Sequence, residues 1–337
     1  MKKTFALILT LLVFLSLSGC GNQEKAPTKE SKTAVSVAML RLTSTAPLFI
    51  AMDKGYFAEE NIEIKPEWFE AAHPIAVATA SGKVDVGATG ITASLYNMAA
   101  MGQKLAIVAD KGREEKDYHS SALLVSNDAY NSGVKNISDL KGKRIGITSK
   151  GSTFTYMLGQ MLEKSGISLD EVTFVPLGKL SSVMATLKSN KIDACVLNEP
   201  NVTKVEKAGY GHMISPVSAI MRYQTSGIFF SPAFVKNEAV NQGFLRAYNK
   251  ACKLYYSAVI SKTNPKARKE IVNIIAKYTK APKEDIEQGL PYIDQNGRLM
   301  AEDIQTQIDW YKAHDMIEGN LKATEVINTS LLEKAIK

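Results

Sequence analysis

Short apolar runs alternate along most of the chain with amphipathic segments that carry helix-capping residues. Residues 35–42, 62–64, 84–87 and 105–109 are apolar runs of strand length. Several of the segments between them open with hydroxyl residues or proline and close at a glycine, as helices do. Strands that alternate with helices at this spacing predict a mainly parallel sheet with helices on its faces.

The same order of elements returns in the middle of the chain. Apolar runs at 143–148, 172–176 and 192–197 are again separated by helical segments. A hexapeptide repeats with them, since Ser81-Gly82-Lys83-Val84-Asp85-Val86 matches Ser189-Asn190-Lys191-Ile192-Asp193-Ala194 at a constant offset of 108 residues. Each copy ends a predicted helix at a residue suited to a left-handed turn and then enters a strand. The repeat predicts two similar α/β lobes.

Two segments of similar form, residues 121–130 and 226–234, are predicted to connect the lobes. One leaves the first lobe and the other returns to it, so together they form a hinge. The predicted fold class is α/β, with two Rossmann-like lobes whose mainly parallel sheets are joined by a two-strand hinge. The chain after about residue 240 is predicted to be helical and to support the first lobe. The expected division is 34–122 for the first part of lobe 1, 123–226 for lobe 2, and 227–337 for the return to lobe 1 with the C-terminal helices.

Residues 1–33 differ from the rest of the chain. Lys2 and Lys3 precede an apolar run, Phe5–Leu17, which is shorter than the ~20 residues that span a bilayer. This pattern predicts a signal peptide over residues 1–19. Leu17-Ser18-Gly19-Cys20 resembles the lipobox of bacterial lipoproteins, which implies a lipidated Cys20, a flexible tether over residues 20–33, and anchoring to the outer face of the cell membrane, or on the periplasmic side in a Gram-negative host. The alternative is an ordinary signal peptide followed by an incidental cysteine.

Composition narrows the classes of function. The 337 residues include 41 Lys or Arg and 34 Asp or Glu, a formal net charge of +7, but only seven of these cations are Arg and the lysines are scattered. Specific nucleic-acid surfaces favour clustered Arg, so we expect no nucleic-acid partner. Three Cys and four His are too few for a disulfide framework or a Cys-rich metal site, and we expect no metal and no cofactor. Cys195 and Cys252 fall in predicted core segments and the common catalytic motifs are absent, so we expect a monomeric binding protein and not an enzyme.

Ligands of open parallel sheets bind beyond the carboxyl ends of the strands, where helix N-termini point outward. Gly90-Ile91-Thr92 and Gly151-Ser152-Thr153 combine glycine, hydroxyl groups and a helix start, a pattern that suits an anion; the alternative is that the hydroxyls only cap their helices. Glu199 could pair with a ligand ammonium or be a solvated helix-start carboxylate, and Arg113 and Arg222 could clamp an anion or be exposed. The candidate ligand-binding residues are Ser44, Thr45, Glu70, Ala71, His73, Gly90, Ile91, Thr92, Gly151, Ser152, Thr153, Phe154, Asn198, Glu199 and Tyr223.

Four motifs in this order resemble one protein family. They are Ala46-Pro47-Leu48-Phe49-Ile50-Ala51 running into Lys54-Gly55-Tyr56-Phe57, Ser81–Gly87 running into Thr89-Gly90, Asp139-Leu140-Lys141-Gly142-Lys143-Arg144-Ile145-Gly146, and Gly151-Ser152. Over residues 34–320 the chain is similar to the substrate-binding lipoproteins of bacterial ABC importers, in the nitrate/sulfonate/taurine-binding family with the type II periplasmic-binding fold.

The resemblance implies capture of a small, sulfonate-like organic anion between the lobes and its delivery to a permease driven by an ATPase. Sulfonate-type members often carry Trp and Asp before the proline, where this chain has Leu197-Asn198-Glu199-Pro200, which argues against a simple alkanesulfonate. A related branch implies two alternatives. One is a binder of a thiamine-type pyrimidine or another small aromatic solute; the other is a pyrimidine synthase, whose clustered-Cys motif this chain lacks.

Overall fold

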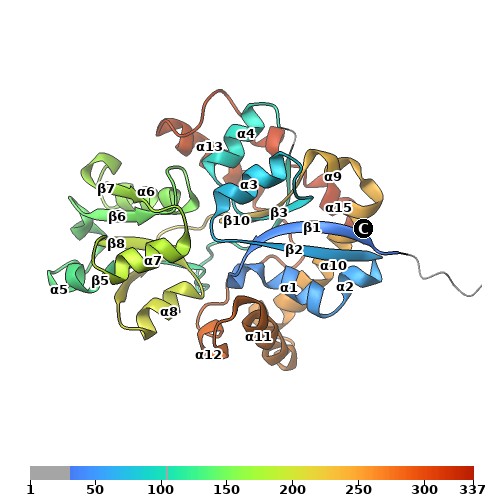
Figure 1. Cartoon of the computed structure of the whole chain (residues 1–337), viewed down its shortest axis with the longest axis horizontal. Coiled ribbons are helices and arrows are strands. Elements are labelled where there is room, and N and C mark those ends of the chain that lie inside the picture. Colours follow the sequence, from blue (N-terminus) through green and yellow to red (C-terminus); the bar gives the residue numbers. More distant parts are fainter. Residues whose placement is uncertain (1–30, 104) are drawn as a thin grey trace, which may run out of the picture. The chain divides into compact units, whose positions relative to one another are not determined.

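The computed structural model describes residues 31–103 and 105–337, so the predicted signal peptide, Cys20 and most of the predicted tether lie outside the described residues. Two five-stranded sheets carry the predicted α/β architecture (Figure 1). The first has the order β2-β1-β3-β10-β4 and the second the order β7-β6-β8-β5-β9. The strands are β1 (Thr33–Leu40), β2 (Ile62–Phe69), β3 (Val86–Gly90), β4 (Ala106–Asp110) and β10 (Ser226–Phe230) in the first sheet, and β5 (Ser121–Ser126), β6 (Arg144–Ile147), β7 (Thr173–Pro176), β8 (Ala194–Asn198) and β9 (Gly211–Pro216) in the second.

Both sheets are mixed in the same way. β1 pairs in parallel with β2 and β3, and β6 pairs in parallel with β7 and β8. In the fourth position of each sheet an antiparallel strand enters from the other lobe, β10 between β3 and β4, and β5 between β8 and β9. β3 runs on to Gly90, beyond the predicted end at Gly87, because its last residues pair with β10.

The repeated hexapeptide occupies the same place in both sheets. Gly82 and Asn190 end their helices with positive φ angles of 72° and 55°. The Asp85 carboxylate then accepts hydrogen bonds from the Ser36 backbone N–H (2.8 Å) and hydroxyl (2.7 Å) at the start of β1. The Asp193 carboxylate likewise accepts from the backbone N–H of Arg144 (2.7 Å) at the start of β6. The structure therefore confirms that the sequence repeat marks two lobes of the same construction.

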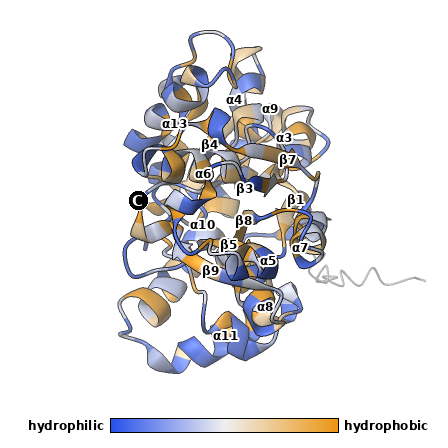
Figure 2. Cartoon of the chain, turned by 90° about the vertical axis from the view of Figure 1, so that its left-hand side faces the viewer, coloured by the Kyte–Doolittle hydropathy of each residue, from blue (hydrophilic) through white to orange (hydrophobic). Residues whose placement is uncertain are grey.

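Helices cover the faces of both sheets. Figure 2 shows hydrophobic and hydrophilic residues on α11, whose Ile271 and Ile275 are buried while Lys269 and Lys277 are exposed. No helix among the described residues is long and apolar enough to cross a membrane. The α-helices are α1 (Ala46–Asp53), α2 (Tyr56–Glu59), α3 (Ala72–Ala80), α4 (Ala93–Ala100), α5 (Asn127–Asn131), α6 (Thr153–Lys164), α7 (Leu180–Lys188), α8 (Asn201–Lys207), α9 (Pro232–Lys236), α10 (Glu238–Tyr255), α11 (Pro265–Thr279), α12 (Lys283–Ile286), α13 (Ala301–Ala313), α14 (Ala323–Val326) and α15 (Ser330–Ile336), with short 3₁₀ turns at Thr43–Thr45, Ile137–Leu140, Leu169–Glu171 and Val217–Ala219 and a π-helical turn at Tyr256–Ile260.

The connections between the lobes are the segments that precede the two antiparallel strands. Residues 111–120 lead into β5 and residues 217–225 lead into β10. The prediction that residues 121–130 and 226–234 form the connections is therefore wrong, because β5 and β10 pair within the sheets themselves. The two connections pair with each other, since Glu114 N–H donates to Tyr223 O (2.9 Å) and Tyr223 N–H donates to Glu114 O (3.2 Å). The predicted division at 122/123 and 226/227 falls at the beginning of these strands, and movement of the lobes about this pairing stays a prediction.

The C-terminal helices do more than support the first lobe. α10 packs against α1, α2 and α15, and α11 against α1, as predicted. α13, however, also reaches the second lobe, where Trp310 packs over Gly159 of α6 and its Nε1–H donates to Glu163 Oε2 (2.8 Å). The Tyr311 hydroxyl donates to the carbonyl of Ser152 (3.1 Å). α13 therefore links α6 to the rest of the molecule.

Candidate functional site

A cavity of about 30 Å³ lies where the carboxyl ends of the two sheets face each other. Backbone and side chains of both lobes enclose it. Its lining residues are Leu40, Leu42, Ser44, Ala71, Ala72, Thr89, Gly90, Lys111, Thr148, Ser152, Thr153, Phe154, Leu180, Asn198, Thr225 and Ser226.

Lys111 is the one ionisable side chain in this lining, within the part of the chain that the structure describes. It directly follows β4, is 1% exposed, and donates from Nζ to the Ser44 hydroxyl (2.9 Å). Burial lowers the pKa of the Lys111 ammonium to about 7, and the charge of Asp110 raises it only in part. A buried ammonium with one neutral partner is costly, and an anion in the cavity would remove that cost.

Thr89, near the end of β3, supplies a second unsatisfied group. It is 1% exposed, and its hydroxyl has no hydrogen-bond partner among the described residues. A buried polar group without a partner costs about 1–3 kcal/mol. Thr89 and Lys111 therefore offer free hydrogen-bonding capacity beside the same small cavity, both from the first lobe.

The second lobe presents the N-terminus of α6, a helix of 12 residues. Its cap is Ser152, whose hydroxyl accepts from Thr155 N–H (3.4 Å). The first N–H groups of a helix have no partner within it and carry a partial positive charge, which favours an anion. Thr153, the first helical residue, lies against Gly90 of the first lobe, where a β-carbon would come 2.5 Å from Thr153 Cγ2. Gly90 therefore allows the two lobes to meet at the cavity.

Direct contacts between the lobes surround the cavity. Ala93 N–H donates to the carbonyl of Gly151 (2.9 Å), and Leu180 N–H donates to the carbonyl of Glu70 (3.1 Å). The Ser181 hydroxyl donates to the Glu70 carboxylate (2.6 Å). These bonds connect the start of a helix in one lobe with a loop of the other, so the described arrangement is a closed one.

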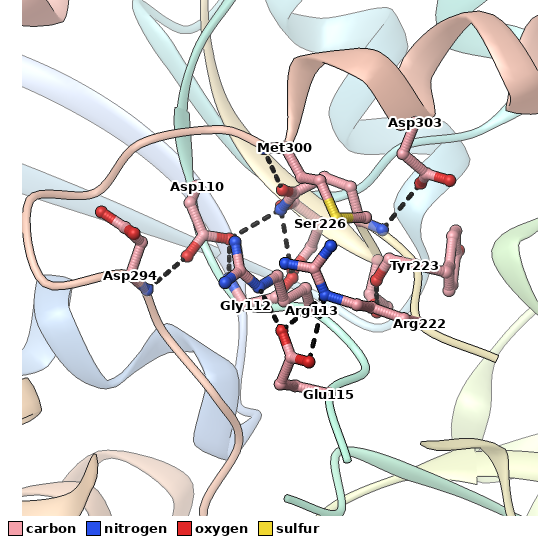
Figure 3. A network of polar contacts seen from close by, with 12 residues as sticks. Asp110, Gly112, Arg113, Glu115, Arg222, Tyr223, Ser226, Asp294, Met300 and Asp303 are labelled. Atoms are coloured by element: carbon pink, nitrogen blue, oxygen red, sulfur yellow. Dashed lines mark hydrogen bonds and ion pairs between the residues drawn. The ribbon is translucent and has the colours of Figure 1, made fainter. Parts of the chain in front are cut away.

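A polar network at the junction of the lobes holds the backbone next to Lys111 (Figure 3). Gln224 Nε2 donates to Asp110 Oδ1 (2.6 Å) and to the carbonyl of Ser226 (2.8 Å). On the other side, Asp294 N–H donates to Asp110 Oδ2 (2.8 Å). Both oxygens of Asp110 are engaged in this way, so its carboxylate anchors the end of β4; it forms no ion pair within 4 Å with Lys111, although its charge still acts on the ammonium.

Arg113 and Arg222, the candidates for an anion clamp, lie on either side of Glu115 (Figure 3). Arg222 Nε is 2.8 Å and Arg113 Nε 3.2 Å from Glu115 Oε2. Neither residue lines the cavity. Both guanidinium groups therefore neutralise a carboxylate of the connection between the lobes.

The candidate residues from the sequence divide into two groups. Ser44, Ala71, Gly90, Ser152, Thr153, Phe154 and Asn198 line the cavity. Thr45, Glu70, His73, Ile91, Thr92, Gly151, Glu199 and Tyr223 do not. Three of the second group have other roles: Thr45 donates to Leu40 O (2.9 Å), Thr92 caps α4, and Ile91 is fully buried.

Glu199 faces away from the cavity, toward α8. Its carboxylate accepts from the N–H (3.1 Å) and the hydroxyl (3.0 Å) of Thr203. Burial raises the pKa of Glu199 to about 7, the bonds from Thr203 lower it, and the charges of Glu206 and Asp285 raise it further. In the closed arrangement the Glu199 side chain therefore binds the first turn of α8 and does not contact the cavity.

The sequence prediction did not include Lys111 and Thr89, two buried residues that line the cavity. The available signal was the pair Asp110-Lys111, two charged residues directly after the apolar run 105–109. A charged residue at the carboxyl end of a buried strand belongs to the ligand-binding edge of such a sheet. The sequence prediction rests instead on glycine and hydroxyl residues at helix starts, which identify Gly90 in the first lobe and Ser152 and Thr153 in the second.

A wider groove of about 720 Å³ adjoins the cavity and shares Leu40, Leu42 and Leu180 with it. Arg41 lies over the ring of Trp68 in this groove, 3.8 Å from its centroid. The lining of the groove also includes Lys204, Lys207 and Lys280 as well as Glu70 and Asp285, so basic residues outnumber acidic ones beside the cavity.

Sequence comparison finds relatives of two kinds. The whole chain is 23% identical, over 355 aligned residues and 98% of the other protein, to the "Putative aliphatic sulfonates-binding protein" of Bacillus subtilis (strain 168). Over 39% of the chain and 35% of the other protein, it is 27% identical to the 4-amino-5-hydroxymethyl-2-methylpyrimidine phosphate synthase of Schizosaccharomyces pombe.

Structural comparison supports the fold. The alkanesulfonate-binding protein SsuA of Xanthomonas axonopodis pv. citri, solved with MOPS bound, has a TM-score of 0.71 and 19% identity, covering 90% of this chain and 97% of that one. At this identity the likeness shows a shared fold, here the predicted periplasmic-binding fold. Residues 42–258 match the family described as "NMT1/THI5 like". The chain therefore belongs to the NMT1/THI5-like family.

Proposed function

We propose that this protein is the extracytoplasmic solute-binding component of an ABC importer, which captures a small organic anion between its lobes and delivers it to a permease and its ATPase. The observation that carries the proposal is the Lys111 ammonium, which is buried in a cavity closed by the N-terminus of α6. The full-length similarity to a protein described as binding aliphatic sulfonates supports a sulfonate-like ligand.

The closed arrangement suggests how each group acts. The Lys111 ammonium neutralises the ligand's charge, and the Thr89 hydroxyl donates to one of its oxygens. The N–H groups at the start of α6 face the ligand from the second lobe. Hydrogen bonds to a charged group contribute about 1.5–3 kcal/mol each, so the anion draws the two walls together.

Binding, rather than catalysis, fits the remaining reactive groups. Among residues 31–103 and 105–337 no group of three or more His, Cys, Asp or Glu could hold a metal ion. Cys195 and Cys252 are fully buried, and burial raises the pKa of their thiols. Both therefore stay in the protonated form, which is a poor nucleophile. The pyrimidine synthase among the relatives keeps a pyrimidine ligand as the second candidate.

Isothermal titration calorimetry of the full-length protein in detergent tests the ligand class. Methanesulfonate, nitrate and a neutral 4-aminopyrimidine are titrated in turn, and hits are checked by thermal unfolding, where a ligand at 100 times its Kd adds about 2.7 kcal/mol of stability. We expect heat and stabilisation with at least one anion. If only the pyrimidine binds, the proposal of an anionic ligand is wrong and the pyrimidine becomes the favoured ligand.

The proposed anchor is tested separately, because Cys20 lies outside the described residues. We expect the protein in its native host to fractionate with membranes and to carry a diacylglyceryl mass on Cys20, through which it stays at the outer face of the cell membrane. The Cys20→Ala variant should be released. An unmodified cysteine in the wild-type protein would contradict lipidation and leave the ligand-binding proposal intact.

A further inference from the structure

We infer that Lys111 restricts this site to ligands that carry one net negative charge. The inference rests on the proposed function and deepens it, because it concerns which anions the closed lobes can hold. It follows from the single positive charge in the cavity lining and from the neutrality of the other lining residues.

The first step is the isolation of the Lys111 ammonium. It is 1% exposed, and its one hydrogen bond within the described chain is to the Ser44 hydroxyl at 2.9 Å. The adjacent carboxylate, that of Asp110, already accepts from Gly112 N–H (2.7 Å), Gln224 Nε2 (2.6 Å) and Asp294 N–H (2.8 Å). The ammonium therefore has no ion pair within 4 Å in the described chain, and the charge of Asp110 offsets its burial only in part.

The second step is the neutrality of the other walls. The lining residues besides Lys111 are apolar, hydroxyl-bearing, amide or glycine, so the described lining holds one formal charge. The hydroxyls of Thr89 and Thr153 and the N-terminus of α6 can donate hydrogen bonds, but they bring no further full charge.

Charge balance in the closed cavity then selects the ligand. A monoanion beside Lys111 gives the ammonium a direct partner, and the charges inside the cavity lining then sum to zero. A neutral ligand leaves the ammonium uncompensated, and a dianion leaves one negative charge uncompensated, and both states are disfavoured away from water. The effect of burial on Lys111, whose pKa falls to about 7, shows the same physics in the absence of a ligand.

Three probes with similar tetrahedral heads separate charge from shape: methanesulfonate with charge −1, methanesulfonamide with charge 0, and sulfate with charge −2. They represent the charged head alone and not the natural ligand, so the sequence pattern that argues against a simple alkanesulfonate does not affect their expected order. We expect the full-length protein at pH 6 and constant ionic strength to bind methanesulfonate at least 100-fold more tightly than either of the others by calorimetry. In Lys111→Met we expect methanesulfonate to lose at least 100-fold in affinity and to bind no better than methanesulfonamide.

Two further variants complete the test. Lys204→Met removes an exposed lysine of the neighbouring groove and should leave the order of the three probes unchanged, which separates the cavity charge from the general basic field. Lys111→Gln, with a polar and neutral side chain, stands in if Lys111→Met fails to fold, as judged by circular dichroism, and the same loss of preference is expected.

The outcomes distinguish the inference from the proposed function. If the wild-type protein binds methanesulfonate but binds sulfate or methanesulfonamide within tenfold, the charge restriction is overturned and anion capture stands. Retention of the preference in both Lys111 variants also overturns it. If none of the three probes binds, the charge restriction fails together with the proposed function on which it rests.

Discussion

The two lobes share a scaffold and differ in what they place at the cavity. Each sheet has two strands parallel to its central one, an antiparallel strand from the other lobe, and an outer strand, in the same order. Yet the outer strand β4 is followed by Lys111, whereas its counterpart β9 is followed by the buried apolar Val217. The comparison teaches that the repeat provides two halves that can close, while the chemistry of the site comes from residues that do not repeat.

The polar groups at the cavity show the same asymmetry. Thr89 in β3, whose hydroxyl has no partner, corresponds at the offset of the repeat to the buried Leu197 in β8. The second lobe contributes mostly satisfied groups, such as the capping hydroxyl of Ser152. An anion held here would therefore receive its charge partner from the first lobe and a helix N-terminus from the second.

The largest effect on stability is expected at a strand position where the first lobe has a glycine and the second lobe has a larger residue. Gly87 in β3 corresponds to Cys195 in β8, and their partners across the ladder are Phe229 and Leu124. A β-carbon at Gly87 would overlap the ring of Phe229. We expect Gly87→Ala to lower the free energy of unfolding by about 3 kcal/mol in urea titrations, because overpacking forces backbone or ring to move.

The matched control makes the first lobe resemble the second. Adding Phe229→Leu to Gly87→Ala relieves the overlap with the ring but leaves Thr79 Oγ1 2.5 Å from the new methyl group, so the double variant should regain only part of the lost stability. The single Phe229→Leu change should lower stability by itself. Strict additivity of the two changes would show that the close packing of Gly87 and Phe229 is not the cause.

Much of the fold could be predicted from the sequence because the repeat is local. The turn at Gly82 or Asn190 and the aspartate three residues later each involve neighbouring positions and the start of one adjacent strand. The role of α13 could not be predicted in this way. Its contact with α6 joins Trp310 to Gly159 and Glu163, residues that are distant in the sequence and share no pattern.

Half of the candidate site could be predicted for a similar reason. A helix start such as Gly151-Ser152-Thr153 carries its own signature, so the wall from the second lobe is visible in the sequence. Lys111 has no such signature, because its burial depends on the closure of both lobes. Thr92 shows the opposite error: its pattern is that of a helix start, but the chain turns its hydroxyl to cap α4 outside the cavity lining.

A second effect is expected at the junction that joins the lobes. Glu114 is fully buried beside Tyr223, and neither its carboxylate oxygens nor the Tyr223 hydroxyl has a hydrogen-bond partner among the described residues. Burial raises the pKa of Glu114 to about 8, although Ser121 and the backbone N–H of Ser120 are near enough to lower it in part. Between about pH 4.5 and 8 the folded protein therefore holds a proton that the unfolded chain releases, and stability falls as the pH rises through this range.

Glu114→Gln removes this dependence. Urea titrations at pH 5 and pH 9 give the difference in unfolding free energy between the variant and the wild type. We expect this difference to shift by about 2 kcal/mol in favour of the variant from pH 5 to pH 9. The shift is smaller than the raised pKa alone implies, because water can reach the junction when the lobes part. Asp110→Asn is the contrasting variant, since the Asp110 carboxylate has three N–H donors. It should destabilise at pH 9. A gain for both variants would contradict the distinction between an unpartnered and a partnered carboxylate.

A smaller effect separates the two helix caps that the sequence treated alike. Thr92 caps α4 and Ser152 caps α6, so replacing either by Ala should cost about 1 kcal/mol of unfolding free energy. Only Ser152 lines the cavity. We therefore expect calorimetry to show about tenfold weaker anion binding for Ser152→Ala and unchanged binding for Thr92→Ala. Equal weakening in both would place the ligand at both helix starts.

The smallest effect concerns the repeated aspartates. Asp193 is partly buried, which tends to raise the pKa of its carboxyl, but the Arg144 side chain and backbone N–H bind it and hold the pKa below its usual value. This stabilisation is present above about pH 4, the pKa of the unfolded group, and is lost as the pH falls through the folded pKa. Because Arg144 is about half exposed, solvent screens the pair, and we expect Asp193→Asn to cost only about 0.5 kcal/mol at pH 7.

Asp85 provides the matched comparison in the first lobe. Its donors, the Ser36 N–H and hydroxyl, are neutral, and an asparagine oxygen can accept from both. The cost of Asp193→Asn should therefore shrink between 0.1 and 1 M NaCl in urea titrations, whereas that of Asp85→Asn should not change with salt. Equal salt dependence would mean that the two lobes use the repeated aspartate in the same way. A difference would show that even the repeated positions have diverged in charge, with an arginine in the second lobe where the first has a serine.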